Sequence, residues 1–248
     1  MDLHVFAIHD IPDVTRDDDL AALIAAAVAG AGRRIDAGDV FVVAQKIVSK
    51  AEGAMVRLDE VAPSRMATQW AADNGKDARV VEVVLRESRR IVRMDRGILI
   101  SETRHGFVCA NAGVDASNVP PGFVTVLPGD PDASAERLRT ALSAIFGCRV
   151  AIIVSDTFGR PWREGAVNVA VGVAGLQPLL DYRGTVDSYG RPLTSTVIAL
   201  ADELAGAAEI VTRKSAGTPV AIVRGAADWM GQGAGRMLVR EASRDLFR

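Results

Sequence analysis

The chain lacks most of the residue patterns that mark secreted or nucleic-acid-binding proteins. Its 248 residues include only two cysteines, Cys109 and Cys148, which are too few and too far apart for a disulfide scaffold or a zinc ribbon. Aromatic residues make up 5% of the chain and the formal net charge is -2, so neither stacking platforms nor a basic surface is available for nucleic acid. We therefore expect no nucleic-acid partner, a reducing compartment and a cytoplasmic location.

Histidines and long apolar runs are also scarce. The histidines are scattered, at His4, His9 and His105, so a Ser-His-Asp triad or a histidine-based metal centre has little to draw on. The longest apolar run, residues 20–32, is too short and too rich in alanine to span a bilayer. Three aspartates precede it, at positions 17–19, which predicts a buried helix with acids at its positive end and no membrane association.

The apolar patterns predict a mixture of strands and helices, hence an α+β or α/β fold, and we expect α+β. Predicted strands cover residues 3–8, 39–44, 91–94, 98–101, 107–110, 150–154 and 219–223. Predicted helices cover residues 20–32, 63–74, 78–87, 132–146 and 194–210. Residues 166–175 fit either type, and the glycine-rich residues 231–235 follow no strand, which predicts a flexible tail. No repeat or linker divides the chain, so we treat residues 1–248 as one unit in which two subdomains remain possible.

The most informative stretch is residues 155–165, SDTFGRPWREG, which follows the buried strand predicted at residues 150–154. Ligands in proteins with mixed sheets commonly bind where strands end. Asp156 and Thr157 offer hard oxygen ligands of the kind that Mg²⁺ or Mn²⁺ prefers. Arg160 and Arg163 could grip phosphate or carboxylate, although surface ion pairs are the alternative. The structural alternative to a binding site is that the whole stretch is only a turn capped by Asp156.

Two other segments carry chemistry of the same kind. Lys46 and Lys50 are four residues apart, so on a helix both ammonium groups lie on one face and can neutralise phosphate, unless that face is merely solvated. Residues 112–118 supply Asp115 and Asn118 in a turn-rich loop, where an Asx turn is the structural alternative. Phosphoryl transfer needs such positioned charges and no nucleophilic side chain. Because Walker and kinase motifs are absent, these residues by themselves predict only metal-dependent handling of a phosphorylated ligand.

Four ordered stretches resemble a known family, the coenzyme F420-0:L-glutamate ligases: residues 44–53 (AQKIVSKAEG), 85–88 (LRES), 112–118 (AGVDASN) and 155–165. The similarity covers nearly the whole chain, from about residue 11 to residues 245–248. It implies a GTP-dependent ligase that adds L-glutamate, in one or more γ-linked steps, to the lactyl-phosphate tail of the deazaflavin coenzyme F420-0. A carboxylate is a poor acyl donor, so the family's route through an acyl phosphate agrees with the chemistry predicted from the residues.

The resemblance also implies roles for individual residues. Asp115 and Asp156 correspond to ligands of one divalent ion, and Thr157 to a ligand of a second. Positions that contact GTP in the family correspond here to Ile11, Pro12, Asp13, Val14, Gln45, Lys50 and Asn118, and to the loop of Arg213, Lys214, Ser215, Ala216, Gly217 and Thr218. Arg160 and Arg163 are assigned to the anionic coenzyme tail or the transferring phosphate, and K⁺ is a candidate monovalent ion.

Lys214 departs from the family pattern. Many members present a glutamine to the second metal from this loop, which is one residue shorter here. A lysine ammonium cannot ligate a cation, so either fewer protein groups hold the second metal or Lys214 replaces part of its charge. We favour replacement as the hypothesis.

The sequence leaves several alternatives open for the assembly and the function of the protein. Family members form an intertwined homodimer with the active site near the subunit interface, and in many relatives the ligase is fused to a nitroreductase-like domain. The chain could be a single-domain enzyme or a piece of a longer protein. It could also be a nucleotide-dependent amide ligase that acts on another carboxylate, or an inactive nucleotide-binding module. Asp115, Asp156, Thr157 and Lys50 argue against inactivity, since clustered acids without a metal repel each other.

Overall fold

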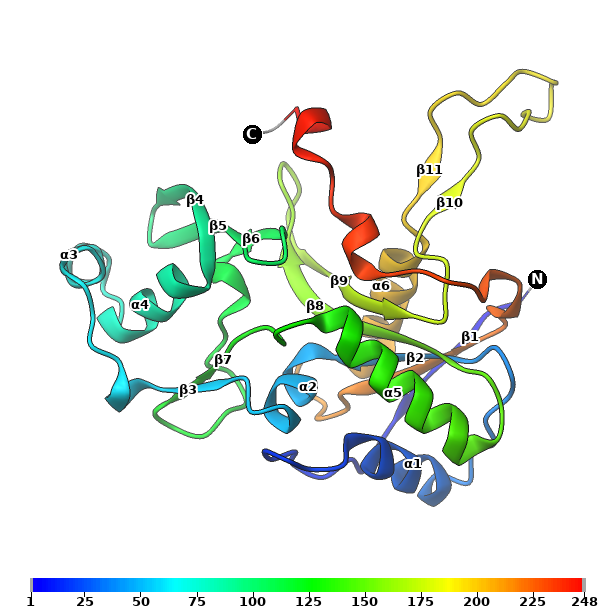
Figure 1. The fold of residues 1–248 in the computed structure, drawn as a ribbon, viewed down its shortest axis with the longest axis horizontal. Helices are drawn as coiled ribbons and strands as arrows, with labels where there is room; N and C mark the ends of the chain where they lie inside the picture. The colour runs from blue at the N-terminus through cyan, green and yellow to red at the C-terminus, as the bar shows by residue number, and fades with distance from the viewer. Residues whose placement is uncertain (1, 247–248) are drawn as a thin grey trace.

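The computed structural model describes residues 2–246, and a five-stranded mixed sheet forms its centre (Figure 1). The strands lie in the order β1 (His4–Ile8), β12 (Val220–Arg224), β2 (Val40–Ala44), β8 (Ala151–Gly159) and β9 (Ala166–Ala174). Only β2 and β8 are parallel, and the other neighbours are antiparallel. The continuously apolar β2 is the middle strand, as its sequence predicts.

Helices cover both faces of this sheet. Side chains alternate along a strand, so Phe41 and Val43 pack with α1 (Leu20–Gly30) and α5 (Pro131–Phe146) on one face. Val40 and Val42 pack with α6 (Leu200–Thr212) on the other face. The result is a helix–sheet–helix sandwich with an apolar core on each side of the sheet.

A second group of elements lies beside the sandwich and comes between α2 and α5 in the sequence (Figure 1). After α2 (Gln45–Ala51), the chain forms a three-stranded antiparallel sheet with two helices against it, and a two-stranded sheet. These elements are β3 (Met55–Arg57), α3 (Arg65–Asn74), α4 (Ala78–Glu87), β4 (Ser88–Asp95), β5 (Ile98–Thr103), β6 (Val108–Ala110) and β7 (Phe123–Thr125). The short pair β10 (Leu180–Asp181) and β11 (Val197–Ile198) begins an arm that projects from the molecule.

The predicted α+β class is confirmed, and local signals account for the helix ends. Asp19 accepts a hydrogen bond from the Ala22 N–H at the start of α1, and Asp130 accepts one from Ala133 at the start of α5. Gly147 ends α5 in the left-handed conformation, which glycine adopts at little cost. The observed α4 has the bounds predicted from its apolar face.

Three expectations require correction, and one open assignment is settled. Strand β8 does not stop at Val154 but continues to Gly159, so Asp156 and Thr157 lie in the strand and not in a loop after it. The stretch that fitted either type forms the strand β9 over residues 166–174, and it pairs with this extension. The helix predicted from residue 194 begins at Leu200, because residues 194–199 belong to the arm and to β11.

The third correction concerns residues 231–235, which are packed and not a flexible tail. The Gly231 N–H donates to the Gly175 carbonyl, and the Gly235 N–H donates to the Asp132 carboxylate. A Cβ atom at Gly233 would lie 2.3 Å from the Leu176 carbonyl oxygen. Glycine is therefore required here for close backbone packing and not for mobility. Within residues 2–246, no helix is both long and apolar enough to cross a membrane.

Candidate active site

Each segment with predicted chemistry contributes residues to the lining of one cavity of about 440 Å³, next to the end of β2. In the parallel pair β2–β8, Ala44 lies opposite Ser155. The chain turns into α2 directly after Ala44, whereas β8 continues past this point with Asp156 and Thr157. The start of α2 and the extension of β8 therefore flank the same space.

Most of the residues predicted for the site line this cavity. They are Ile11, Pro12, Asp13, Val14, Gln45, Lys50, Asp115, Asn118, Asp156, Thr157, Arg213, Lys214, Ser215, Gly217 and Thr218. The cavity lining includes neither Ala216 nor the two predicted arginines, Arg160 and Arg163. The Arg160 guanidinium donates to the carbonyl oxygens of Glu164 and Gly165 at the tip of the β8–β9 hairpin.

The Asp156 carboxylate is partly buried, and one of its two oxygens accepts a hydrogen bond. Its Oδ1 accepts the Thr157 N–H at 2.8 Å, and no other hydrogen bond reaches this carboxylate from residues 2–246. Burial raises its pKa to about 6, the Thr157 N–H opposes the rise, and the charge of Asp115 adds to it. Lys214 and Lys46 lower the same pKa, which indicates that both cations lie near this acid.

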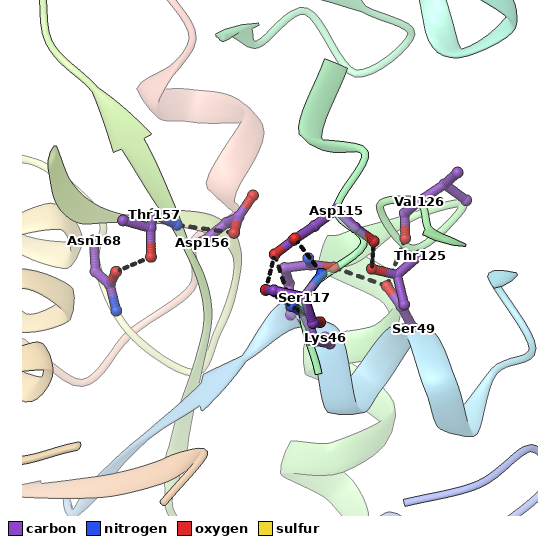
Figure 2. Close-up of polar contacts among 10 residues, drawn as sticks. Lys46, Ser49, Asp115, Ser117, Thr125, Val126, Asp156, Thr157 and Asn168 are labelled. Atoms are coloured by element: carbon purple, nitrogen blue, oxygen red, sulfur yellow. Dashed lines mark hydrogen bonds and ion pairs between the residues drawn. The ribbon is translucent and has the colours of Figure 1, made fainter. Parts of the chain in front are cut away.

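Asp115 is the second acid, and it approaches from the loop before β7 (Figure 2). Its Oδ1 accepts the Ser117 N–H at 2.7 Å, so the Asx turn offered as the alternative is present. Its Oδ2 accepts hydrogen bonds from Lys46 Nζ at 2.6 Å and from Ser117 Oγ at 2.8 Å. Burial tends to raise the pKa of Asp115, but the hydrogen bonds from Lys46 and Ser117 outweigh it and lower the pKa.

A hydrogen-bonded chain holds Thr157 from the neighbouring strand and helix. The Thr157 hydroxyl donates to Asn168 Oδ1 at 2.8 Å, and Asn168 Nδ2 donates to Glu209 Oε2 at 2.9 Å. Because the hydroxyl hydrogen points to Asn168, the oxygen lone pairs of Thr157 stay available for a cation. Asn168 and Glu209 were missed as site residues. The signal for Asn168 was its position opposite Thr157 in a β8–β9 hairpin, which required residues 166–175 to be recognised as a strand.

The helix α2 places its two lysines on different acids. Lys50 is 7% exposed at its side chain and donates to Asp13 Oδ1 at 2.6 Å, whereas Lys46 binds Asp115. Gln45 is buried and accepts the Ser49 hydroxyl at 2.8 Å, which orients its amide beside the cavity. The helical spacing of Lys46 and Lys50 is confirmed, and their cationic groups line the same cavity.

The donor set at the cavity fits a divalent cation. Asp115, Asp156 and Thr157 supply the hard oxygens that Mg²⁺ or Mn²⁺ accepts. Within the described residues, no three side chains of His, Cys, Asp or Glu gather as a ready cage. Such an ion would therefore complete its coordination with water or substrate phosphates, as Mg²⁺ usually does. Cys109 is no rival nucleophile, because burial and the charge of Asp156 raise the pKa of its thiol to about 12.

Comparison with known proteins gives one consistent result. A family model described as F420-0:Gamma-glutamyl ligase matches residues 9–225. The chain is 46% identical over 252 aligned positions to the coenzyme F420:L-glutamate ligase of Methanothermobacter thermautotrophicus, with 100% of each chain covered. It is 50% identical to the protein of that name from Methanopyrus kandleri, covering 93% of this chain and 92% of the relative. The Archaeoglobus fulgidus protein of that name is 40% identical, covering 100% of this chain and 97% of the relative.

The raised pKa of Asp156 predicts that metal binding depends on pH. A proton competes with the ion for this carboxylate below its pKa of about 6. We expect the apparent Mn²⁺ affinity to rise by up to about tenfold per pH unit below about pH 6 and to level off above it. Calorimetric titration between about pH 5 and about pH 8 measures this, and an affinity that is independent of pH would contradict it.

A matched variant, Asp156→Asn, gives a second readout in the metal-free protein. Since folding raises the carboxyl pKa from 3.8 to about 6, ionised Asp156 destabilises the folded state as pH rises through this range. At pH 7 the free energy of unfolding in urea is therefore expected to be higher for the variant than for the wild type by about 3 kcal/mol. A variant less stable than the wild type would show that the burial of Asp156 carries no such penalty.

Proposed function

Because this chain belongs to the F420-0:gamma-glutamyl ligase family, we propose that it joins L-glutamate to coenzyme F420-0, with GTP as the energy source. The observation that best supports the proposal is the meeting of Asp115, Asp156 and Thr157 with Lys46 and Lys50 at one cavity. Acidic oxygens that suit a divalent ion and cations that suit phosphate are the groups that phosphoryl transfer requires. The absence of a Walker motif is compatible with this role, since the proposed phosphate site lies where β2, α2 and β8 meet, outside any such motif.

The proposed reaction has two balanced steps. The carboxylate oxygen of the coenzyme tail attacks the γ-phosphorus of GTP, the bond from that phosphorus to the β-phosphate oxygen breaks, and GDP leaves. The glutamate amine then attacks the acyl carbon, the bond from that carbon to the phosphate oxygen breaks, and phosphate leaves with the electron pair. The amine proton passes to solvent. A divalent ion bound at Asp115, Asp156 and Thr157 would neutralise phosphate charge.

In this scheme, the side chains of the protein bind and orient the reactants. Lys50, buried and paired with Asp13, offers an ammonium beside the space for the nucleotide. The chain of Thr157, Asn168 and Glu209 keeps the Thr157 oxygen turned toward the site. Gln45 and Asn118 line the same cavity and supply polar contacts for GTP. These groups position reactants and spread charge, and none of them forms a covalent bond.

The direct test supplies the purified protein with GTP, Mg²⁺ or Mn²⁺, L-glutamate and glutamate-free coenzyme F420-0. We expect mass spectrometry to detect one or more added glutamyl units, with one GDP and one phosphate released for each unit. Asp156→Ala is expected to lower turnover by roughly 10²- to 10³-fold, because it removes an electrostatic group of the site. The exposed Asp73→Ala on α3 is the matched control and should turn over normally.

The possible failures of this assay have different meanings. Nucleotide binding without a mass change in any coenzyme acceptor would favour an inactive module. GTP turnover supported by another carboxylic acid would favour a ligase with a different acceptor. Full activity of Asp156→Ala would contradict the assignment of that residue to the metal.

We assign Arg160 and Arg163 to the anionic tail of the coenzyme and not to the transferring phosphate, because they lie at the β8–β9 tip outside the cavity lining. Trp162, between them, is 79% exposed and has a positive φ of 57°, which is uncommon for a large residue. A planar ring flanked by two cations suits a deazaflavin with a phosphodiester tail.

Replacing both arginines tests this assignment. Arg160→Gln combined with Arg163→Gln is expected to raise the KM for the coenzyme by about tenfold, through the loss of two charge contacts. The KM for GTP should stay constant, and Arg149→Gln, at the opposite end of β8, should change neither value. A rise in the KM for GTP alone would assign the arginines to the nucleotide.

We propose that Lys214 replaces part of the charge of a second metal ion. Its ammonium lies near enough to Asp156 to lower the pKa of that acid, and its loop lines the cavity. Lys214→Gln removes this fixed charge, so turnover should fall at low Mg²⁺ and recover at a higher concentration that fills a second site. Unchanged turnover and unchanged metal dependence would exclude the role.

We also propose that the protein is a homodimer. The arm between β10 and β11 projects from the molecule and exposes Val186 and Tyr189 at its end, by 61% and 87% (Figure 1). Exposed apolar groups on a projecting arm suit contact with the surface of a second copy. Sedimentation velocity distinguishes a dimer from a monomer, and a monomer would contradict the proposal.

A further inference from the structure

We propose that Lys46 exchanges partners during the reaction: it holds the carboxylate of Asp115 in the absence of metal, and moves onto the transferring phosphoryl group when a divalent ion occupies that carboxylate. The proposal rests on the function proposed above. It makes Lys46 a catalytic residue that contacts the substrate. The four-residue spacing with Lys50 suggested phosphate neutralisation by both lysines, and the new element is the exchange of Lys46 between Asp115 and the phosphoryl group.

In the metal-free protein, the Lys46 ammonium contacts oxygen atoms of the kind that would otherwise bind a metal ion. Its Nζ lies 2.6 Å from Asp115 Oδ2 and 2.7 Å from Ser117 Oγ, and it also donates to the Ser117 carbonyl (Figure 2). All three partners are oxygens, and two come from side chains that a hard metal ion would accept. The side chain of Lys46 is 15% exposed, so this position is largely removed from solvent.

Lys46 is not needed to position Asp115. The Ser117 N–H and hydroxyl already hold the two carboxylate oxygens, at 2.7 Å and 2.8 Å. The backbone of Asp115 is paired with Thr125 in both directions, and the Thr125 hydroxyl donates to the Asp115 carbonyl at 3.1 Å (Figure 2). A purely structural role for Lys46 would therefore duplicate contacts that are present without it.

If a metal ion binds Asp115, electrostatic repulsion drives the Lys46 ammonium away from that carboxylate. An ammonium and a divalent ion on one carboxylate oxygen repel each other strongly at such short range in a partly buried site. Lys46 lies in the first turn of α2 and lines the cavity, so rotation of its flexible stem moves the ammonium toward the space for the nucleotide. There it can donate hydrogen bonds to phosphoryl oxygens, and it stays protonated throughout because it only binds.

Lys50 provides a contrast within the same helix. Its partner Asp13 has a side chain that is 79% exposed, and Asp13 lies in the loop after β1 and is not one of the proposed metal ligands. A metal ion at Asp115 and Asp156 gives Lys50 no reason to move. The exchange is therefore specific to Lys46.

The test is a Mn²⁺ titration without nucleotide, combined with steady-state turnover. Lys46→Met removes the competing cation, so Mn²⁺ should bind about tenfold more tightly than to the wild type. The same variant should lose roughly 10²- to 10³-fold in turnover, because one donor to the phosphoryl group is gone. Lys46→Arg keeps the charge and should keep Mn²⁺ affinity near the wild-type value, and the exposed Lys76→Met is the matched control.

Opposite shifts in metal affinity and turnover identify the exchange. A structural role predicts that both fall together in Lys46→Met, and unchanged or weaker Mn²⁺ binding would overturn the proposal. If Lys46→Met does not fold, carbon NMR of the wild type tests the exchange instead, through the signals of the lysine ε-carbons of Lys46, Lys50, Lys76 and Lys214. Mg²⁺ should shift the Lys46 signal, assigned with Lys46→Arg, and an unshifted signal overturns the exchange. The titration needs neither coenzyme nor glutamate, so failed glutamate addition with these metal effects present would contradict only the proposed function.

Discussion

The site depends on the parallel pairing of β2 with β8 at the centre of the sheet. Their register places Ala44 opposite Ser155, and β2 ends there while β8 continues beside β9. Both strands are buried along their apolar parts, so a shift of register would move whole sets of core side chains to the wrong face. The same packing that stabilises the fold therefore fixes Asp156 and Thr157 against the first turn of α2.

This arrangement places like charges together, which the surrounding residues must offset. Asp115 and Asp156 are close enough for one to raise the pKa of the other. In the metal-free protein Lys46 neutralises Asp115, while the nearby charges of Lys46 and Lys214 favour the ionised form of Asp156. This balance of charges supports the proposal that cations bind here, and small movements of lysine side chains would adjust the charge of the site to the proposed metal and phosphate.

Local patterns predicted much of the fold, and long-range pairing explains what they missed. The caps of α1 and α5, the face of α4 and the apolar strands β2 and β12 are all visible within short windows of sequence. Residues 155–159, which begin with Ser155, Asp156 and Thr157, resemble a loop in the sequence, because their strand conformation comes from pairing with β9. Residues 231–235 resemble a tail for a similar reason, since their glycines serve contacts with Leu176 and Asp132 far away in the sequence.

The same distinction between local patterns and long-range contacts applies to the candidate site. Individual residue types and the family resemblance singled out Asp115, Asp156, Lys50 and the loop of Lys214, which the structure brings to one cavity. Their roles stay predictions, whereas the family membership is shown by the comparisons. The links from Thr157 through Asn168 to Glu209, and from Lys46 to Asp115, connect segments that only the folded chain brings together. No local pattern contains that information.

Metal and phosphate are proposed to meet beside the end of β2, where β8 continues past it. A crystal structure with Mn²⁺ and a non-hydrolysable GTP analogue, with manganese located by anomalous scattering, would decide whether they do. We expect manganese bound by Asp115 and Asp156, the γ-phosphate beside it, and Lys46 released from Asp115. Manganese or phosphates located elsewhere, with the Lys46–Asp115 pair intact, would show that the proposed site is wrong.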